Sequence, residues 1–397
     1  MPLSNRSSDP LSVQEAAEEQ QQGKTSGWAH QQLSRIPIKV FRSHTDAISS
    51  CHFCFEDSKI LTCSYDKTAI LWDAESGDPV LAFKGGHSAP IVECALTPDN
   101  KRLITASWDK TMTAWDMETG HILWKAVHDG LLTSCSVSLD GKYVASASDM
   151  ENALYVTCAE TGEKVFHIKD HHKSTVTRCR FDPGSQRVAT VSADKTIKLW
   201  DLVARRTTLS INSTHSNVIS NCCFTSNGRH LCTASWDKTL QLWDIQTGQF
   251  RSRGGVKLHK GHEGNISSSV FSQDSSLLVS GACDRNVTVW DMEGLCKKLV
   301  LKGHVDWVMD VAISADKKWV ASGSKDTTLR MWNIEHSDHI PAVIETRKAA
   351  GFQIIKCELC KKPFSITQME NSEFISKCVF CRLMAPSRNY LPAPPAL

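Results

Sequence analysis

The sequence lacks a long hydrophobic run and an excess of charge of either sign. No stretch of its 397 residues approaches the ~20 apolar residues that a membrane-spanning helix needs, and residues 1–27 hold no apolar run of signal-peptide length. Lys and Arg total 45, and Asp and Glu total 43, which gives a formal net charge of +2. No electrostatic argument therefore favours nucleic acid or a membrane as the partner, and we expect a soluble protein that binds neither.

The 16 cysteines lack the pattern of a disulfide-stapled domain. Twelve of them are scattered over residues 51–296 and form no spaced metal motif. Cysteines used in this way are typical of a reducing compartment. We therefore expect the protein to be intracellular, in the cytoplasm, the nucleus or both.

A short unit that contains Ser, Asp and Trp recurs along most of the chain. In six copies a Trp follows the first Asp by six residues, and a His precedes that Asp by 22 residues. Five copies carry all four residue types at this spacing. They are His44, Ser64, Asp66 and Trp72; His87, Ser107, Asp109 and Trp115; His172, Ser192, Asp194 and Trp200; His215, Ser235, Asp237 and Trp243; and His304, Ser324, Asp326 and Trp332.

These repeats resemble the WD-repeat family of β-propellers. A period of roughly 40–45 residues with a His near its start and Trp-Asp at its end is typical of a four-stranded blade repeated around an axis. Seven such histidines, His128 being the third, mark seven blades. The resemblance implies an all-β fold, a seven-bladed WD40 β-propeller over residues 36–346.

The remaining residues divide into two tails and one small segment. Residues 1–35 and 385–397 are expected to be disordered, and residues 347–384 to form a zinc-ribbon-like segment. Residues 36–41 read as a strand that completes the last blade. Residues 340–344 could fill the same place from the other end of the chain, but we favour the N-terminal strand, because in the family such a strand commonly closes the ring.

Two repeats depart from the pattern. In the third, Asp149 follows His128 by 21 residues, and Thr157-Cys158 stands where Trp-Asp is expected. We predict that this blade forms without its internal hydrogen-bond network. In the sixth, Ala282 replaces the Ser, which is a milder loss.

A recurring His, Ser and Asp could indicate nucleophilic catalysis, but the number of copies argues against it. A catalytic triad is needed once, beside a pocket and an oxyanion hole. The structural interpretation is stronger: Asp accepts from His, His contacts Ser, and Ser contacts the Trp indole N–H. The resemblance implies the same network in the five complete copies.

In the WD-repeat family, partners bind the end of the ring that carries the tight turns. The resemblance places these contacts just before the turn Asp and three and five residues after the His. An aromatic residue before the Asp can also simply pack across its own turn. The candidate partner-binding residues are Tyr65, Trp108, Leu131, Trp236, Trp307, Met309 and Lys325, and Ala193 and Cys283 occupy equivalent positions.

Four cysteines after the repeats form two Cys-x-x-Cys pairs, Cys357 with Cys360 and Cys378 with Cys381, 17 residues apart. This spacing fits a structural zinc site of four thiolates. Disulfides are disfavoured by the expected compartment, and a redox pair would need only one motif. We predict bound zinc and no organic cofactor.

Together these patterns predict a non-enzymatic scaffold that binds protein or peptide partners. One alternative is the substrate receptor of a ubiquitin ligase. That subgroup of the family often carries an Arg two residues after Trp-Asp, and this chain does not. A quinone-binding enzyme is a third hypothesis, for which the sequence offers no cofactor motif.

Overall fold

The computed structural model describes residues 36–248, 250–258, 261–337, 353–359, 361 and 363–366. All of the described residues belong to one unit, Ile36–Leu397. The expected tails at residues 1–35 and 385–397 lie outside this range. Among the described residues, no helix has the length and apolar character needed to cross a membrane.

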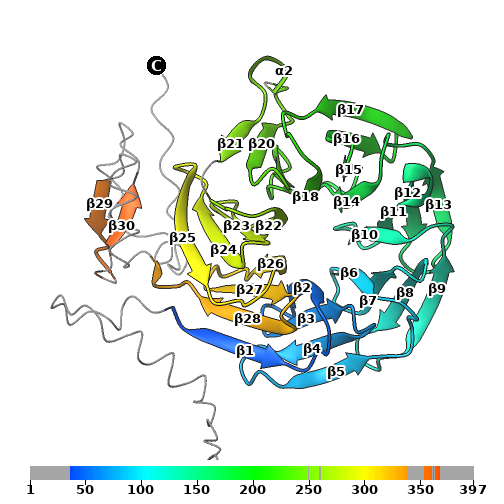
Figure 1. Ribbon diagram of the computed structural model, residues 1–397, viewed down its shortest axis with the longest axis horizontal. Coiled ribbons are helices and arrows are strands. Elements are labelled where there is room, and N and C mark those ends of the chain that lie inside the picture. The colour runs from blue at the N-terminus through cyan, green and yellow to red at the C-terminus, as the bar shows by residue number, and fades with distance from the viewer. Residues whose placement is uncertain are drawn as a thin grey trace, which may run out of the picture. The chain divides into compact units, whose positions relative to one another are not determined.

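Seven antiparallel sheets of four strands each stand around a central axis as the blades of a propeller (Figure 1). The predicted all-β, seven-bladed fold is therefore confirmed. In every blade the first strand lies nearest the axis and the fourth forms the rim.

The four strands of each blade are arranged from the axis to the rim in the following order. Blade one consists of β2 (Ile48–Cys54), β3 (Lys59–Ser64), β4 (Ala69–Asp73) and β5 (Pro79–Phe83); blade two of β6 (Ile91–Leu96), β7 (Arg102–Ser107), β8 (Thr111–Asp116) and β9 (Ile122–Val127); blade three of β10 (Leu132–Val137), β11 (Tyr143–Ser148), β12 (Leu154–Cys158) and β13 (Lys164–Ile168); and blade four of β14 (Val176–Phe181), β15 (Arg187–Ser192), β16 (Thr196–Asp201) and β17 (Arg206–Asn212). Blade five consists of β18 (Ile219–Phe224), β19 (His230–Ser235), β20 (Leu240–Asp244) and β21 (Val256–Leu258); blade six of β22 (Ile266–Phe271), β23 (Leu277–Ala282), β24 (Asn286–Asp291) and β25 (Cys296–Lys302); and blade seven of β26 (Val308–Ile313), β27 (Trp319–Ser324), β28 (Thr328–Asn333) and β1 (Ile38–Arg42). Two short helices, η1 (Met150–Asn152) and α2 (Phe250–Arg253), lie in blades three and five.

The inner strands are buried on both sides because each sheet is covered by its neighbours. In β3, five of six residues are buried, whereas most of the rim strand β5 is exposed. Between blades seven and one, Phe41, Ile48, Trp72 and Met331 pack in one cluster. Burying a side chain of this size contributes about 1.5–3 kcal/mol, so the core consists of layers between blades.

The N-terminal strand closes the ring. β1 pairs antiparallel with β28, with Ile38 opposite Trp332 and Arg42 opposite Thr328. The prediction that this segment completes the last blade is confirmed. Closure by the two ends of the repeat region removes an open sheet edge that could recruit other chains.

Each inner strand contains a bulge near its start, as between Ile48 and Ser50 of β2. The bulged residue turns toward the next blade, so Ser49 Oγ donates to the Ile91 carbonyl at 2.6 Å. Equivalent bonds between blades are made by Thr133, Thr177, Ser220 and Ser267. The bulge therefore fastens neighbouring blades to each other.

A glycine precedes several of the recurring histidines because the blade's indole ring lies against it. A Cβ added at Gly86 would come within 2.3 Å of Trp115, and one at Gly261 within 2.0 Å of Trp290. Any larger residue at these positions would displace the Trp.

A separate hairpin follows the ring. β29 (Gln353–Lys356) pairs with β30 (Pro363–Ile366), and Cys357 lies buried at the start of the connecting segment. Cys360, Cys378 and Cys381 lie outside the described residues, so the predicted zinc site stays a prediction.

Candidate functional site

The tight turns between second and third strands lie at the same end of the ring as the histidine loops, and we call this end the turn face. The residue after each turn Asp has a left-handed backbone, with a φ of 71° at Lys67 and 70° at Lys238. The Ser64 amide donates to the Thr68 carbonyl at 3.1 Å and so closes the turn in blade one. These closed turns present their exposed residues in fixed positions.

A polar network inside each blade holds the turn to the strands. In blade one, His44 Nδ1 lies 2.8 Å from Asp66 Oδ2, and His44 Nε2 lies 2.8 Å from Thr62 Oγ1. Trp72 Nε1 donates to the same hydroxyl at 2.8 Å. A neutral imidazole with its proton on Nδ1 satisfies all three contacts, because the hydroxyl can then donate to Nε2.

The structure corrects the hydroxyl step of the predicted network. The residue that joins His to Trp stands two positions before the predicted serine, on the same face of the strand. Ser64 instead caps the turn: its Oγ accepts from the Asp66 amide at 3.1 Å and donates to the Asp46 carbonyl at 3.1 Å. The predicted role was therefore wrong for Ser64, and likewise for Ser107, Ser192, Ser235 and Ser324, which cap their turns in the same way. The hydroxyls that contact the histidines are Thr62, Thr105, Thr190, Thr233, Ser280 and Ser322.

Hydrogen bonds within the network stabilise the ionised form of the turn Asp. Burial raises the pKa of Asp66, but hydrogen bonds from His44 and Thr68 outweigh it and hold the pKa well below its usual range. Burial lowers the pKa of His87, His172, His215 and His304. In the blades of these four histidines, a carboxylate therefore lies beside an imidazole that burial favours as the neutral form.

Blades four and six vary the network. In blade four a second imidazole, His171, contacts the same hydroxyl as His172, with Nε2 at 2.9 Å from Thr190 Oγ1. Blade six forms a full network, because His262 Nδ1 lies 3.1 Å from Asp284 Oδ2, and Ser280 Oγ lies 2.8 Å from His262 Nε2. The predicted loss at Ala282 is mild because only the turn cap is missing.

Blade three forms its sheet without the network, as predicted. His128 is buried, and neither ring nitrogen has a protein partner among the described residues. The buried hydroxyls of Ser146 and Thr157 are also without one there. The Tyr155 ring stands edge-on to His128, with centroids 4.6 Å apart. An aromatic contact thus replaces the hydrogen bonds.

Backbone hydrogen bonds bring the two kinds of candidate partner-binding position together. In every blade, the amide of the residue before the turn Asp, or of Asp149 in blade three, donates to the carbonyl of the third residue after the His. Lys325 donates to Trp307 at 2.8 Å in this way. The other pairs are Tyr65 with Ala47, Trp108 with Pro90, Asp149 with Leu131, Ala193 with Thr175, Trp236 with Val218 and Cys283 with Asn265.

Several of these side chains are exposed on the turn face. Trp108, Trp236 and Trp307 are 39%, 45% and 48% exposed, and Leu131 is 37% exposed. Two contacts order them: the Tyr65 and Trp108 rings lie 5.2 Å apart, and Lys325 Nζ lies 4.5 Å from the Trp307 ring centroid. Met309, by contrast, is only half-exposed, at the bulge of β26.

A belt of buried polar residues crosses the axis below this face. Arg178 Nη1 of blade four lies 3.1 Å from Glu93 Oε1 of blade two, and Arg178 Nη2 lies 3.6 Å from Asp310 Oδ1 of blade seven. Burial raises the pKa of Glu93, but the charges of Arg178 and Arg180 outweigh burial, so the pKa lies below its usual value. Each blade contributes to this level the sixth residue after its His, and the set is Ser50, Glu93, Ser134, Arg178, Asn221, Ser268 and Asp310.

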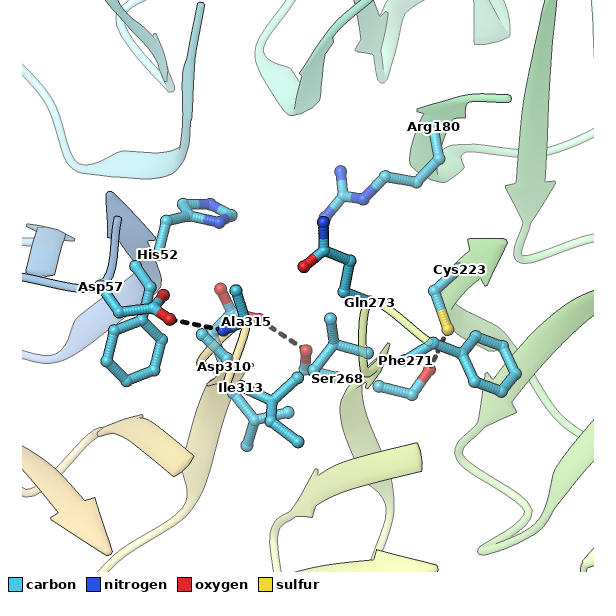
Figure 2. A pocket seen from close by; sticks show the side chains of 15 residues that line it. His52, Asp57, Arg180, Cys223, Ser268, Phe271, Gln273, Asp310, Ile313 and Ala315 are labelled. Atoms are coloured by element: carbon cyan, nitrogen blue, oxygen red, sulfur yellow. Dashed lines mark hydrogen bonds between the residues drawn. The ribbon is translucent and has the colours of Figure 1, made fainter. Parts of the chain in front are cut away.

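A pocket of about 400 Å³ opens on the far side of the belt, among the turns that join first and second strands. Asp57, Gln273, Ala315, His52, Arg180 and Cys223 are among the residues that line it (Figure 2). Its carboxylates are already engaged, since Asp57 Oδ2 accepts from the Ala315 amide at 2.7 Å and Asp310 accepts from Ser50 and Ser268. In the described part of the chain no three His, Cys, Asp or Glu residues are placed to hold a metal ion.

The repeats also match a known family. The model described as "WD domain, G-beta repeat" matches residues 35–73, 77–116, 162–201, 206–244, 255–291 and 295–333, more than half of the chain. It does not match residues 117–161, which hold the three inner strands of blade three, where the network is absent. The chain therefore belongs to the WD-repeat family of β-propellers, whose members are generally non-enzymatic protein-interaction scaffolds. The protein is an interaction scaffold of this class.

Similarity to individual proteins agrees with this class. The chain is 50% identical to human WD repeat-containing protein 88 over 360 residues, which are 90% of this chain and 76% of that protein. It is 34% identical to nuclear distribution protein PAC1-2 of Uncinocarpus reesii, over 44% of this chain and 40% of that protein. It is 25% identical to a guanine nucleotide-binding protein subunit beta of Oryza sativa subsp. indica, over 65% of this chain and 60% of that protein.

Proposed function

We propose that a protein or peptide partner binds the turn face, over blades five, six, seven, one and two. These blades are consecutive in the ring, because β22 packs against both β18 and β26, β26 packs against β2, and β2 packs against β6. They carry Trp236, Cys283, the Trp307 and Lys325 pair, and the Tyr65 and Trp108 pair. The arc therefore offers three aromatic anchors at fixed positions.

The observation that carries this proposal is the clamp between Lys325 and Trp307. The backbone hydrogen bond of 2.8 Å fixes the two residues side by side, and the cation lies over a ring that is 48% exposed. Large rigid side chains of this kind contribute most of the free energy at protein interfaces. Because the ring is held before binding, little side-chain entropy is lost when a partner covers it.

The test is capture of partners by the triple variant Trp108→Ala, Trp236→Ala, Trp307→Ala in cells. A matched control is Leu139→Ala with Val203→Ala, because these exposed apolar residues, 64% and 80% exposed, lie in turns at the opposite end of the ring. We expect the triple variant to lose partners that the control retains. Undiminished capture by a folded triple variant would exclude this face.

The ubiquitin-ligase alternative is not favoured. The two residues after Trp-Asp or Trp-Asn contain no Arg in any of six repeats, and the second of them is Glu75, Glu118, Val203, Gln246, Glu293 or Glu335. Failure to bind a purified ligase adaptor would agree with this reading.

We propose further that Cys357, Cys360, Cys378 and Cys381 bind a structural zinc ion. The support is their spacing and the position of Cys357, buried where β29 ends, with its carbonyl accepting from the Lys361 amide at 2.9 Å. Four thiolates would surround the metal tetrahedrally and supply folding energy to a segment too short for its own core. Metal analysis of purified protein should find one zinc per chain, and Cys378→Ser with Cys381→Ser should remove it while the ring stays folded.

A further inference from the structure

Two cysteines of blade five face each other beside the pocket. Cys223 on β18 pairs directly with Cys232 on β19. Residues opposite each other on antiparallel strands have Cα atoms about 4.5–5.5 Å apart, within the range that a disulfide bridges. Side chains of such a pair project from the same face of the sheet, and both belong to the cluster between blades five and six.

Only one of these two thiols lines the pocket. Cys223 is part of the pocket wall, next to Phe271 (Figure 2), whereas Cys232 is fully buried behind it. Cys223 Sγ lies 3.6 Å from Ser269 Oγ, and Arg180 lines the same pocket. A small molecule that enters the pocket therefore reaches Cys223 first.

The surroundings lower the pKa of Cys223 and raise that of Cys232. Burial raises the pKa of Cys223, but hydrogen bonds with Cys232 and Ser269 and the positive charge of Arg180 outweigh it and lower the pKa below its usual value. Its hydrogen bond with Cys223 and burial raise the pKa of Cys232 well above the usual value. A thiolate is the reactive form of cysteine, so the lowered pKa makes Cys223 the more reactive of the two. The thiol of Cys232 can donate a hydrogen bond to the sulfur of Cys223.

We propose that Cys223 is an oxidation site for a small peroxide, and that Cys232 resolves it to a disulfide. The Cys223 sulfur attacks one peroxide oxygen, so that an S–O bond forms, the O–O bond breaks, and the leaving hydroxide takes a proton to become water. Cys232 then loses its proton and attacks the sulfur of Cys223, forming the S–S bond while the S–O bond breaks and a second water leaves. Two thiols and one hydrogen peroxide thus give one disulfide and two waters.

Another thiol pair gives an internal comparison. Cys63 and Cys94 lie in the cluster between blades one and two, both are buried, and their thiols are hydrogen-bonded to each other. Neither of them lines the pocket. If contact between two buried thiols were sufficient, this pair would oxidise as readily as the pair in blade five.

The test is peptide mapping of the full-length protein after hydrogen peroxide, with free thiols blocked before tryptic digestion under non-reducing conditions. Cys223 lies in residues 207–229 and Cys232 in residues 230–238, so a disulfide links two separate peptides. We expect this link to form before any link between Cys63 and Cys94, to persist in Cys222→Ser, and to disappear in Cys223→Ser. In Cys232→Ser we expect Cys223 to accumulate as a sulfenic acid that dimedone labels.

The opposite results would overturn the proposal. These are a link that survives in Cys223→Ser, equal oxidation of the Cys63 and Cys94 pair, or no link at peroxide doses that oxidise Cys158 and Cys283, which are more exposed. The wild-type map decides the matter even where a serine variant fails to fold, since it compares two thiol pairs within one molecule.

Discussion

Arg178 and Glu93 meet inside the ring, with Nη1 3.1 Å from Oε1, although they come from blades four and two. Arg180 Nη2 contacts the same oxygen at 2.5 Å, and Glu93 Oε2 accepts from the Cys135 amide of blade three at 2.9 Å. One buried carboxylate therefore joins three blades across the axis. The belt makes the axis of the ring a packed part of the fold.

Glu93→Ala is expected to destabilise the ring strongly. It leaves Arg180 without its carboxylate partner and Arg178 with only Asp310 at 3.6 Å, and breaking such a buried pair costs about 3–5 kcal/mol. The free energy of unfolding in urea is the measurement. Lys142→Ala removes an exposed ion pair of 3.9 Å to Asp140 and should change that free energy by less than about 1 kcal/mol. Equal effects of the two variants would contradict the belt.

Thr233→Val should destabilise blade five more than Ser235→Ala. The first change leaves His215 Nε2 and Trp243 Nε1 buried without their hydroxyl, at a cost of about 1–3 kcal/mol. The second removes only a turn cap, and blade six carries Ala282 at that position naturally. The melting temperatures of both variants measure this difference. A larger loss of stability in Ser235→Ala would show that Ser235, and not Thr233, is the hydroxyl of the network.

His128→Leu and His215→Leu should have opposite consequences. His215 has partners on both ring nitrogens, Asp237 at 2.8 Å and Thr233 at 2.9 Å, so its loss removes one buried hydrogen bond from each of them, at about 1–3 kcal/mol. His128 has no protein partner among the described residues, so an apolar side chain there should be neutral or stabilising. Urea unfolding distinguishes them, and a large loss in His128→Leu would show that blade three has a network after all.

Acid should destabilise the ring from about neutral pH downward. Burial lowers the pKa of His128 from 6.5 to about 4, and that of His171 from 6.5 to about 3. A lowered histidine pKa contributes stability that is fully present above 6.5 and is lost as pH falls toward the folded value, because the unfolded chain binds the proton first. Below 3.8, Asp284, whose pKa is lowered to about 2, adds a further loss.

The measurement for this prediction is the melting temperature as a function of pH. His171→Asn removes one of the protons taken up on unfolding, so its curve should fall less steeply than that of the parent between pH 6.5 and 4. Parallel curves would show that His171 is not held neutral in the fold.

The ring could be predicted from the sequence because the constant spacing of the repeated residues is enough to identify the blades. The constant interval of 22 residues predicts the His and Asp contact, and the His44 and Asp66 pair forms as expected. The choice between Thr62 and Ser64 failed because both hydroxyls project from one face of β3. The Trp72 indole N–H contacts Thr62, the hydroxyl farther from the turn. The spacing of the residues does not predict this contact.

The belt and the pocket were missed for a different reason. The sequence does contain a polar residue six positions after every His. Because the inner strand is expected to be buried, a polar residue there is unusual and could have indicated the belt. Which charges meet across the axis depends on side-chain length and on the order of blades around the ring. Glu93 and Arg178 are 85 residues apart, and no local pattern pairs them.

The most direct test of the partner face is hydroxyl-radical footprinting of the protein with and without a captured partner. We expect oxidation of Trp108, Trp236 and Trp307 to fall in the complex, while Leu139 and Val203 at the opposite end remain unchanged. Protection of Leu139 and Val203, with the three tryptophans as reactive as before, would contradict the account.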